Sequence, residues 1–332
     1  MSRIAGVVIL LLFLYGALAS SNPNAIQGGN LRELANYQGF YGVITLGATL
    51  VIITGGIDLS IGSVVGLGAV LFGVLLEENV HPYLAAVLVV AAGTVIGLAH
   101  GLLVTKLKLQ PFLVTLCGMF IYRGIARQLS KHPVGLETVK GMHPDLTGPI
   151  QSLQYLLAGK DAEGLLVFPA QFVVLWVLAA IAGVALHRSV YGRYWYAIGY
   201  NDQAARYAGI RVDRHRIAVY VLSSALAAFA GVLLLLDFGS VMPETAGTSL
   251  ELYAITGAVL GGCSLRGGEG TAIGIVLGAA VLPLIQNLLI FYRIPDAIMP
   301  VLIGVVLLVG VMLDEAIRRG TFRTLWRRSA GS

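Results

Sequence analysis

Three short polar segments hold most of the residues that could do chemistry, and long apolar runs separate them. The first segment covers 54–60 and reads TGGIDLS. A carboxylate between apolar runs is costly unless it faces water, protein or a partner, and paired glycines interrupt helical order. One interpretation is that Gly55, Gly56, Asp58 and Ser60 line a polar path or that Asp58 is a proton site. The equally weighted alternative is that Asp58 or Ser60 caps the helix that follows.

The second segment covers 261–270 and reads GGCSLRGGEG, with five glycines in ten residues. Such a run could cradle a phosphate, but the GxxxxGK[ST] pattern is absent from the whole chain, so we expect no nucleotide-binding P-loop. A tight turn between two apolar runs is the favoured interpretation. GGCSL at 261–265 echoes GGIDL at 55–59, which could be a trace of internal duplication or chance.

The third segment, which we call the basic segment, covers 188–216 and holds six arginines against two acids. Inside it, 201–209 predicts a short helix that Asn201 or Asp202 caps and Gly209 ends. Ala204 and Ala205 would allow a partner to approach closely. The segment is therefore either a docking surface that carries an amphipathic helix or a solvated loop whose arginines fix the topology.

Other candidates are few. In the apolar run 271–290, Pro283 could kink a helix while Gln286 and Asn287 supply hydrogen bonds along a path. The two cysteines, Cys117 and Cys263, lie in apolar runs without CxxC spacing, which is typical of small buried side chains. With no HExxH, GxSxG or metal-ligand cluster, we expect no metal, no cofactor and no enzymatic activity.

The elements that position these residues follow from composition. Of 332 residues, 57% are hydrophobic and 12% are charged, against about 25% charged in soluble domains. Many apolar runs approach the ~20 residues that span a bilayer, which predicts an all-α polytopic membrane protein with about ten transmembrane helices and broken or re-entrant segments at 54–62 and 261–270. The predicted spans are 4–20, 36–54, 61–77, 84–105, 111–129, 166–187, 217–236, 251–264, 271–290 and 298–313.

Charge predicts the orientation. With both termini in the cytoplasm, fifteen of the 22 Lys and Arg residues fall on the cytoplasmic side and seven on the other, as the positive-inside rule requires. We therefore expect one transmembrane domain over 1–332, with an outer loop at 130–165 and the basic segment 188–216 on the inside. The basic tail 314–332 would anchor at anionic membrane lipid. The net charge of +5 is thus explained without nucleic acid.

The first apolar run allows two interpretations. Arg3, the run to Leu18 and the Ala17–Ala19 triplet are similar to a signal peptide with an A-x-A cleavage site. In a chain with many later spans we favour an uncleaved first helix. The topology downstream is the same in both cases.

Taken together, the three segments resemble the inner-membrane permeases of bacterial ATP-binding cassette (ABC) importers for monosaccharides, the branch for ribose, xylose, galactose and autoinducer-2. The resemblance covers about residues 30–313. It rests on the order and spacing of GGIDLSIGSVVGL, YGRYWYAIGYNDQAARYAGI and LGGCSLRGGEGTAIGIVLGA.

The resemblance implies a permease of the bacterial inner (plasma) membrane that pairs with a second permease copy, identical or paralogous. It also implies a separate ABC ATPase subunit and a periplasmic sugar-binding protein as partners. The family's coupling segment maps onto Asn201, Asp202, Gln203, Ala204, Ala205 and Gly209. Gln203 stands where many relatives carry an acid, and Cys263 and Arg266 replace small polar residues, which puts the identity of the ATPase partner in doubt.

Two other classes stay open at this stage. An ion-coupled secondary transporter with broken helices would work without an ATPase, although paired intramembrane charges are scarce here. A related ABC permease could carry a non-sugar substrate such as branched-chain amino acids.

Overall fold

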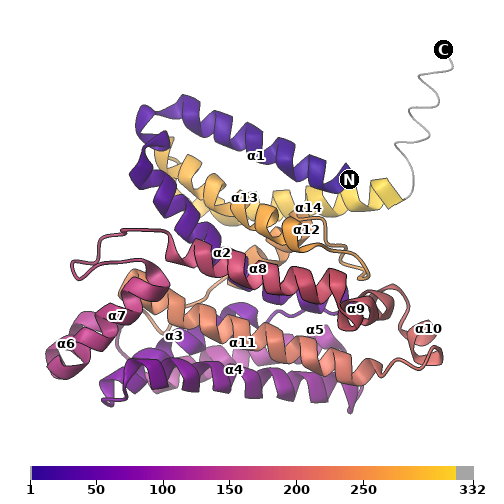
Figure 1. The fold of residues 1–332 in the computed structure, drawn as a ribbon, viewed down its shortest axis with the longest axis horizontal. Helices are drawn as coiled ribbons and strands as arrows, with labels where there is room; N and C mark the ends of the chain where they lie inside the picture. Colours follow the sequence, from indigo (N-terminus) through magenta and orange to yellow (C-terminus); the bar gives the residue numbers. More distant parts are fainter. Residues whose placement is uncertain (1, 319–332) are drawn as a thin grey trace.

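The computed structural model describes residues 2–318 as an elongated bundle whose principal helices run along its long axis (Figure 1). The principal helices are α1 (Ser2–Ser21), α2 (Gly28–Ile53), α3 (Ile61–Glu77), α4 (Pro82–Thr105), α5 (Pro111–Leu129), α8 (Ala170–Arg188), α11 (Val212–Phe238), α12 (Leu250–Leu260), α13 (Ala272–Phe291) and α14 (Met299–Arg318). Each of the ten predicted spans falls on one of these helices.

Length and composition support a membrane bundle. Within the described residues, α2, α4, α8, α11 and α13 are long and apolar enough to cross a bilayer, and α1, α3, α12 and α14 contain shorter apolar stretches. Local sequence explains several boundaries: α4 and α5 begin with proline in the first turn, where its missing N–H is harmless. The chain is therefore an all-α polytopic membrane protein, as predicted, with one two-residue strand pair added.

Two helices form the centre. α11 packs against α4, α3 and α2, and α2 also packs against α8, α13 and α12. In the apolar 18-residue stretch of each helix, 83% of the residues of α2 and 72% of those of α11 are buried, against 33% in α4 and in α8. α1 lies along α13, where Leu18 is fully buried (Figure 1). The inner pair is thus held by protein contacts and the outer helices leave apolar faces exposed.

The predicted outer loop 130–165 is a folded element. It contains β1 (Val134–Gly135), α6 (Leu136–Met142), a 3₁₀ turn η2 (Pro144–Leu146) and α7 (Thr147–Ala158). β1 pairs antiparallel with β2 (Ser240–Val241), and an ion pair joins Lys160 to the buried Asp237 carboxylate, with Nζ–Oδ1 at 3.2 Å. Apolar residues such as Val139 and Ile150 are buried, which explains why this long connection is ordered.

The chain is irregular within both predicted breaks, 54–62 and 261–270, and also at 242–249, which was not predicted. The predicted span 251–264 is a helix of only 11 residues, α12, which ends at Leu260 because Gly261 and the left-handed Gly262 close it. Before α12, residues 242–249 enter the bundle as irregular chain. There Gly247 packs directly on the backbone of Gly62, in the first turn of α3. Arg123 of α5 pairs with Glu251 of α12 at 3.1 Å, so the start of α12 is held by charge as well as by packing.

The two ends of the described chain lie at the end of the bundle that carries the short helices of the basic segment (Figure 1). The backbone is described to residue 318, so the predicted basic tail 314–332 lies largely outside the described residues. The start of α1 and the end of α14 lie at the same end of the bundle as α9 (Val190–Tyr200) and α10 (Asp202–Tyr207) (Figure 1). Short 3₁₀ turns η1 (Pro23–Ile26) and η3 (Asp296–Ile298) precede α2 and α14.

Candidate functional site: the basic segment and a glycine junction

The basic segment folds into two short helices and the start of a long one. Ser189 caps α9 by accepting the Gly192 amide at 3.3 Å, and Asn201 caps α10 by accepting the Ala204 amide at 2.9 Å. Gly209 follows α10 with φ of +82°, a left-handed conformation that glycine adopts without strain. The predicted helix at 201–209 is confirmed, with Asn201 as its cap. The segment's last residues, from Val212, already belong to α11.

The two alanines of α10 face opposite ways. Ala205 is buried against Ile198 and Val212, so it holds α10 onto the bundle. Ala204 and Gln203 are exposed. Beside them stand two tyrosines that are among the most exposed large side chains described, Tyr200 at 86% and Tyr207 at 91%.

A network of charges fixes α10 on α11. Arg206 contacts Asp202 at 3.1 Å and Asp213 at 2.7 Å, and Arg216 contacts the other oxygen of Asp202 at 3.2 Å. The hydrogen bond from Arg206 to Asp213 raises the pKa of this guanidinium further above its usual range. Single exposed ion pairs contribute little, but a network of four groups orients a short helix.

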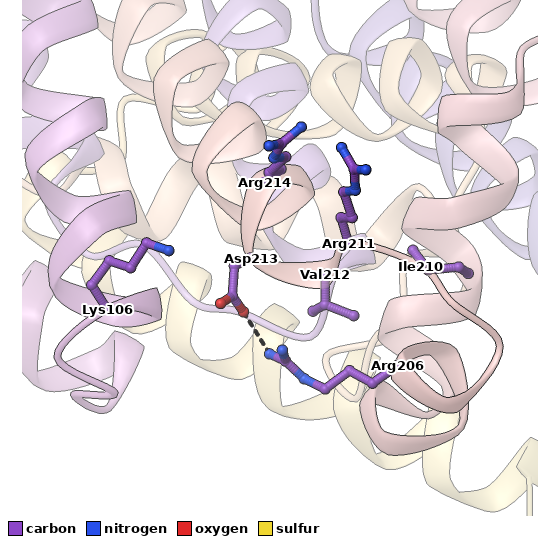
Figure 2. Close-up of a pocket in the computed structure, with 7 residues that line it drawn as sticks. All are labelled: Lys106, Arg206, Ile210, Arg211, Val212, Asp213 and Arg214. Atoms are coloured by element: carbon purple, nitrogen blue, oxygen red, sulfur yellow. Dashed lines mark hydrogen bonds and ion pairs between the residues drawn. The ribbon is translucent and has the colours of Figure 1, made fainter.

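A surface pocket of about 250 Å³ adjoins this network. Figure 2 shows Lys106, at the end of α4, on one side and Arg206 on the other, with the Arg206–Asp213 bond between them. Arg211 and Arg214 also line the pocket. Among the residues that the structure describes, neither of these two arginines nor Lys106 has a carboxylate partner. The surface around α10 therefore carries uncompensated positive charge.

Three backbones that are distant in sequence meet directly behind α10, at what we call the glycine junction. The Gly268 amide donates to the Ile53 carbonyl, at the end of α2, at 2.9 Å. A Cβ atom on Gly199, near the end of α9, would overlap both the Ile53 carbonyl oxygen and the Gly268 amide nitrogen. The junction thus excludes any side chain at 199 and joins all three predicted segments.

Side chains of α9 extend the junction. The Tyr196 hydroxyl donates to the Gly270 carbonyl at 2.7 Å. Burial, followed by the proximity of Cys263, raises the pKa of Tyr196 to about 12, so the hydroxyl keeps its proton near neutral pH. Trp195 packs with Ile53 and Leu186 in one apolar cluster. Movement of α9 would therefore pull on both α2 and the loop 261–270.

Segment 54–60 carries the chain from the junction back into the bundle. Asp58 is 2% exposed. One of its oxygens accepts the Ser60 amide at 2.9 Å and the Ser60 hydroxyl at 2.6 Å, and the other accepts the Ser223 hydroxyl at 3.2 Å. The carboxylate thus organises the start of α3 and fastens it to α11. Ser60 stands at the N-cap of α3 but makes no side-chain capping bond, and the acceptor at this helix start is the Asp58 carboxylate, which bonds to the Ser60 amide.

The other predicted path residues lie elsewhere. Gln286 of α13 donates to the Tyr41 hydroxyl at 3.2 Å and to the Tyr253 hydroxyl at 3.5 Å, beneath a stacked Tyr41–Tyr253 pair with centroids 5.2 Å apart. Asn287 exchanges two hydrogen bonds with Asn30. Asp58 and Gln286 therefore belong to separate polar clusters, and the hydrogen bonds described for the two share no partner.

Sequence reasoning missed several of these residues. Tyr200 and Tyr207 carried no signal beyond being aromatic in a polar stretch, although an aromatic residue flanking a capped helix is a usable sign of a contact surface. Gly199 and Tyr196 had no local signal, because their partners are at Ile53 and in 268–270. Glu251 was overlooked because its partner Arg123 comes 128 residues earlier.

Comparison with known proteins identifies the family. Residues 30–311 match the model of the family described as branched-chain amino acid transport system / permease component. The chain belongs to this family of membrane permease components.

Named relatives support the same assignment. The chain is 35% identical over 301 residues to the ribose import permease protein RbsC of Bacillus subtilis (strain 168), covering 89% of this chain and 87% of that protein. It is 36% identical over 286 residues to the autoinducer 2 import system permease protein LsrC of Escherichia coli (strain K12 / DH10B), covering 86% and 79%. It is 32% identical over 309 residues to RbsC of Escherichia coli (strain K12), covering 93% and 92%. No solved structure matches this chain.

Proposed function

We propose that this chain is the membrane-spanning subunit of an ABC importer that carries a monosaccharide, ribose or a related sugar, across the bacterial inner membrane. The names of the relatives support the substrate class. The observation that carries the proposal is α10, an outward-facing, capped helix with exposed Gln203, Ala204 and flanking tyrosines, held on the bundle by Ala205 and the Arg206 network.

In this proposal a separate ATPase subunit docks on α10. Tyr200 and Tyr207 are the anchors, because aromatic side chains dominate contact energies at such surfaces. Lys106, Arg211 and Arg214 around the pocket would meet acidic side chains of the ATPase and steer association. Hydrolysis occurs on that partner, and this chain contributes movement rather than chemistry.

The glycine junction is the proposed route of coupling. Displacement of α10 moves α9, and the close backbone contacts at Gly199 pass this motion to Ile53 and Gly268 together. From there it reaches α2, the most buried span, and α13. A route counts as allosteric only if both ends bias the same two-state element, and the proposed element is the inward- or outward-open arrangement of a permease pair.

The translocation path is proposed to form between this chain and a second copy or a paralogue. Gly55, Gly56, Asp58 and Ser60 are its proposed inner boundary, and Gln286 and Asn287 belong to its outer half. The half-buried Tyr41, Tyr253 and Gln286 set supports a sugar, since aromatic faces with a few placed amide and hydroxyl groups suit a polar ring.

The orientation is also a proposal. Both termini and α10 would face the cytoplasm, as the charge bias favours. The opposite end, with β1, α6 and α7, would then receive the periplasmic sugar-binding protein (Figure 1).

The docking hypothesis can be tested at Ala204. We expect Ala204→Trp to reduce co-purification of the ATPase about tenfold and to abolish uptake, as truncation or blocking of a central contact commonly costs over 1 kcal/mol. Ala162→Trp, at an exposed position of the opposite end, is the control and should leave co-purification unchanged. Ala205 is unsuitable for this test because its burial makes loss of structure the expected result. Normal uptake by Ala204→Trp would refute docking through α10.

A second substrate class is kept because the matching family model is described by branched-chain amino acids. Binding of labelled ribose and of labelled leucine to the cognate periplasmic protein distinguishes the two classes. An ion-coupled transporter would instead import without an ATPase and stop when an ionophore collapses the gradient.

A further inference from the structure

A groove of about 490 Å³ lies on the surface between α8 and α13. Its body is apolar and is lined by side chains of both helices, among them Trp176, Ala180, Val184 and Ile273. Trp176, Val184 and Ile273 are more than half exposed. The groove is distinct from α10 and from the path residues proposed above.

One end of the groove is polar and basic. His187 and Arg188, the last two residues of α8, line it together with Thr271, which caps α13. Both His187 and Arg188 are exposed, and Arg188 has no carboxylate partner among the ion pairs of the described residues. The groove therefore has a cationic end and an apolar remainder.

We propose that this groove is a binding site for an anionic phospholipid. The span from Trp176 to Arg188 is about 18 Å of helix, comparable to one leaflet's share of a ~30 Å hydrocarbon core. Arg188 ends a span at the basic side of the molecule, where lipid phosphates lie, and basic pockets between helices bind acidic headgroups. The acyl chain would fill the apolar body while the phosphate contacts Arg188 and His187.

Charge and exposure favour a lipid over a second permease copy. Only 33% of the residues in the apolar 18-residue stretch of α8 are buried within the chain. The exposed apolar side chains of this helix therefore require an apolar neighbour. The segregation of one basic end from one apolar body matches an amphiphile with a single headgroup. The inference depends on the chain being a membrane protein and does not depend on which substrate it carries.

The site also adjoins the glycine junction. The His187 ring stacks on Tyr196, with centroids 6.3 Å apart and planes 22° apart, and Tyr196 holds the Gly270 carbonyl. Thr271 and Ala272, which line the groove, follow Gly270 directly. A bound lipid would brace α8 against α13 next to the element that is proposed to transmit motion.

The test measures phosphatidylglycerol retained by the full-length permease after purification from membranes in mild detergent, by native mass spectrometry. Ala180→Phe fills the groove from an exposed position, and Val177→Phe enlarges an exposed side chain on the same helix that does not line it. Arg188→Gln removes the arginine at the cationic end, and Arg193→Gln removes another exposed charge, outside the groove. We expect about fivefold less retained lipid in Ala180→Phe and Arg188→Gln and wild-type retention in both controls.

Three results would overturn the site. One is equal retention in all four variants, and another is a wild type that is no richer in phosphatidylglycerol than the surrounding membrane. The third is dissociation of a permease pair by Ala180→Phe with no change in bound lipid, which would assign the groove to a second copy. ATPase co-purification is expected to stay unchanged in Ala180→Phe, so failure of this inference is distinguishable from failure of the docking proposal.

Discussion

The two glycine-containing segments, 54–60 and 261–270, begin alike and then diverge. Each follows a helix end that is closed by a left-handed glycine, Gly55 or Gly262. In the first, the Gly56 amide bonds to the Val51 carbonyl, and in the second the Cys263 amide bonds to the Ala258 carbonyl. Both are Schellman-type caps that satisfy the last carbonyls of a helix.

After the cap, the segments are fixed by different groups. Segment 54–60 is held by one side chain, since the Asp58 carboxylate bonds to Ser60 and Ser223. Segment 261–270 is joined to α2 and α9 by main-chain contacts, through the Gly268 amide and its close approach to Gly199. Similar short sequences are thus anchored by a buried carboxylate in one place and by close main-chain contacts at glycine in another. They should therefore fail under different substitutions.

The largest effect is expected from Gly199→Ala. The added methyl group overlaps the Ile53 carbonyl and the Gly268 amide, and overpacking of this kind costs about 1–3 kcal/mol. Because both contacts belong to the proposed coupling route, we expect uptake to fall tenfold or more, measured with radiolabelled substrate in cells that contain equal amounts of permease.

Gly124→Ala is the matched control for this variant, because its added methyl group would meet open space. It should transport like the wild type. Wild-type uptake by Gly199→Ala would show that the junction tolerates expansion and has no part in coupling.

An intermediate effect is expected from Asp58→Asn. The amide oxygen can still accept the Ser60 hydrogen bonds, and the amide nitrogen can donate to the Ser223 hydroxyl, so the segment should remain folded. Loss of a charge-assisted bond costs about 1 kcal/mol, which predicts a several-fold lower uptake rate with a normal amount of inserted permease. Failed insertion of this variant would instead assign Asp58 a purely structural role.

The smallest effect is expected from Cys263→Ala. This side chain is buried next to Gly270, but the second segment is held by its main chain, and removal of one small group costs about 1 kcal/mol or less. Uptake should stay within about twofold of the wild type. A large loss, in the same transport assay, would show that side chains anchor this segment too and that the contrast is wrong.

Local features were predictable from the sequence. The helices follow the apolar runs, and the Asn201 cap and Gly209 end of α10 follow from residue type. The GGIDL and GGCSL echo was also informative, but its register misleads. When the two sequences are aligned, Gly55 corresponds to Gly261. When the two helix caps are matched by their left-handed glycine, Gly55 corresponds to Gly262. One extra residue before the second cap accounts for the offset.

Nonlocal features could not be predicted. Which alanine of α10 is buried depends on Ile198 and Val212, and nothing within 201–209 distinguishes Ala204 from Ala205. The junction depends on three residues separated by more than sixty positions each, at 53, 199 and 268. Hydropathy likewise assigned 251–264 as a full span, because the run through Gly261, Gly262 and Cys263 carries no charge, although the left-handed Gly262 ends α12 at Leu260.

The short helix α12 has a consequence for how the chain enters the membrane. Eleven residues cover about 16 Å, roughly half of the ~30 Å hydrocarbon core, and the irregular 242–249 lacks the continuous backbone hydrogen bonding of a helix, which lipid cannot replace. As an isolated segment, α12 would partition poorly out of the insertion channel. We expect it to integrate together with α13, after α3 is in place to shield Gly247, so biogenesis of this protein should be ordered rather than helix by helix.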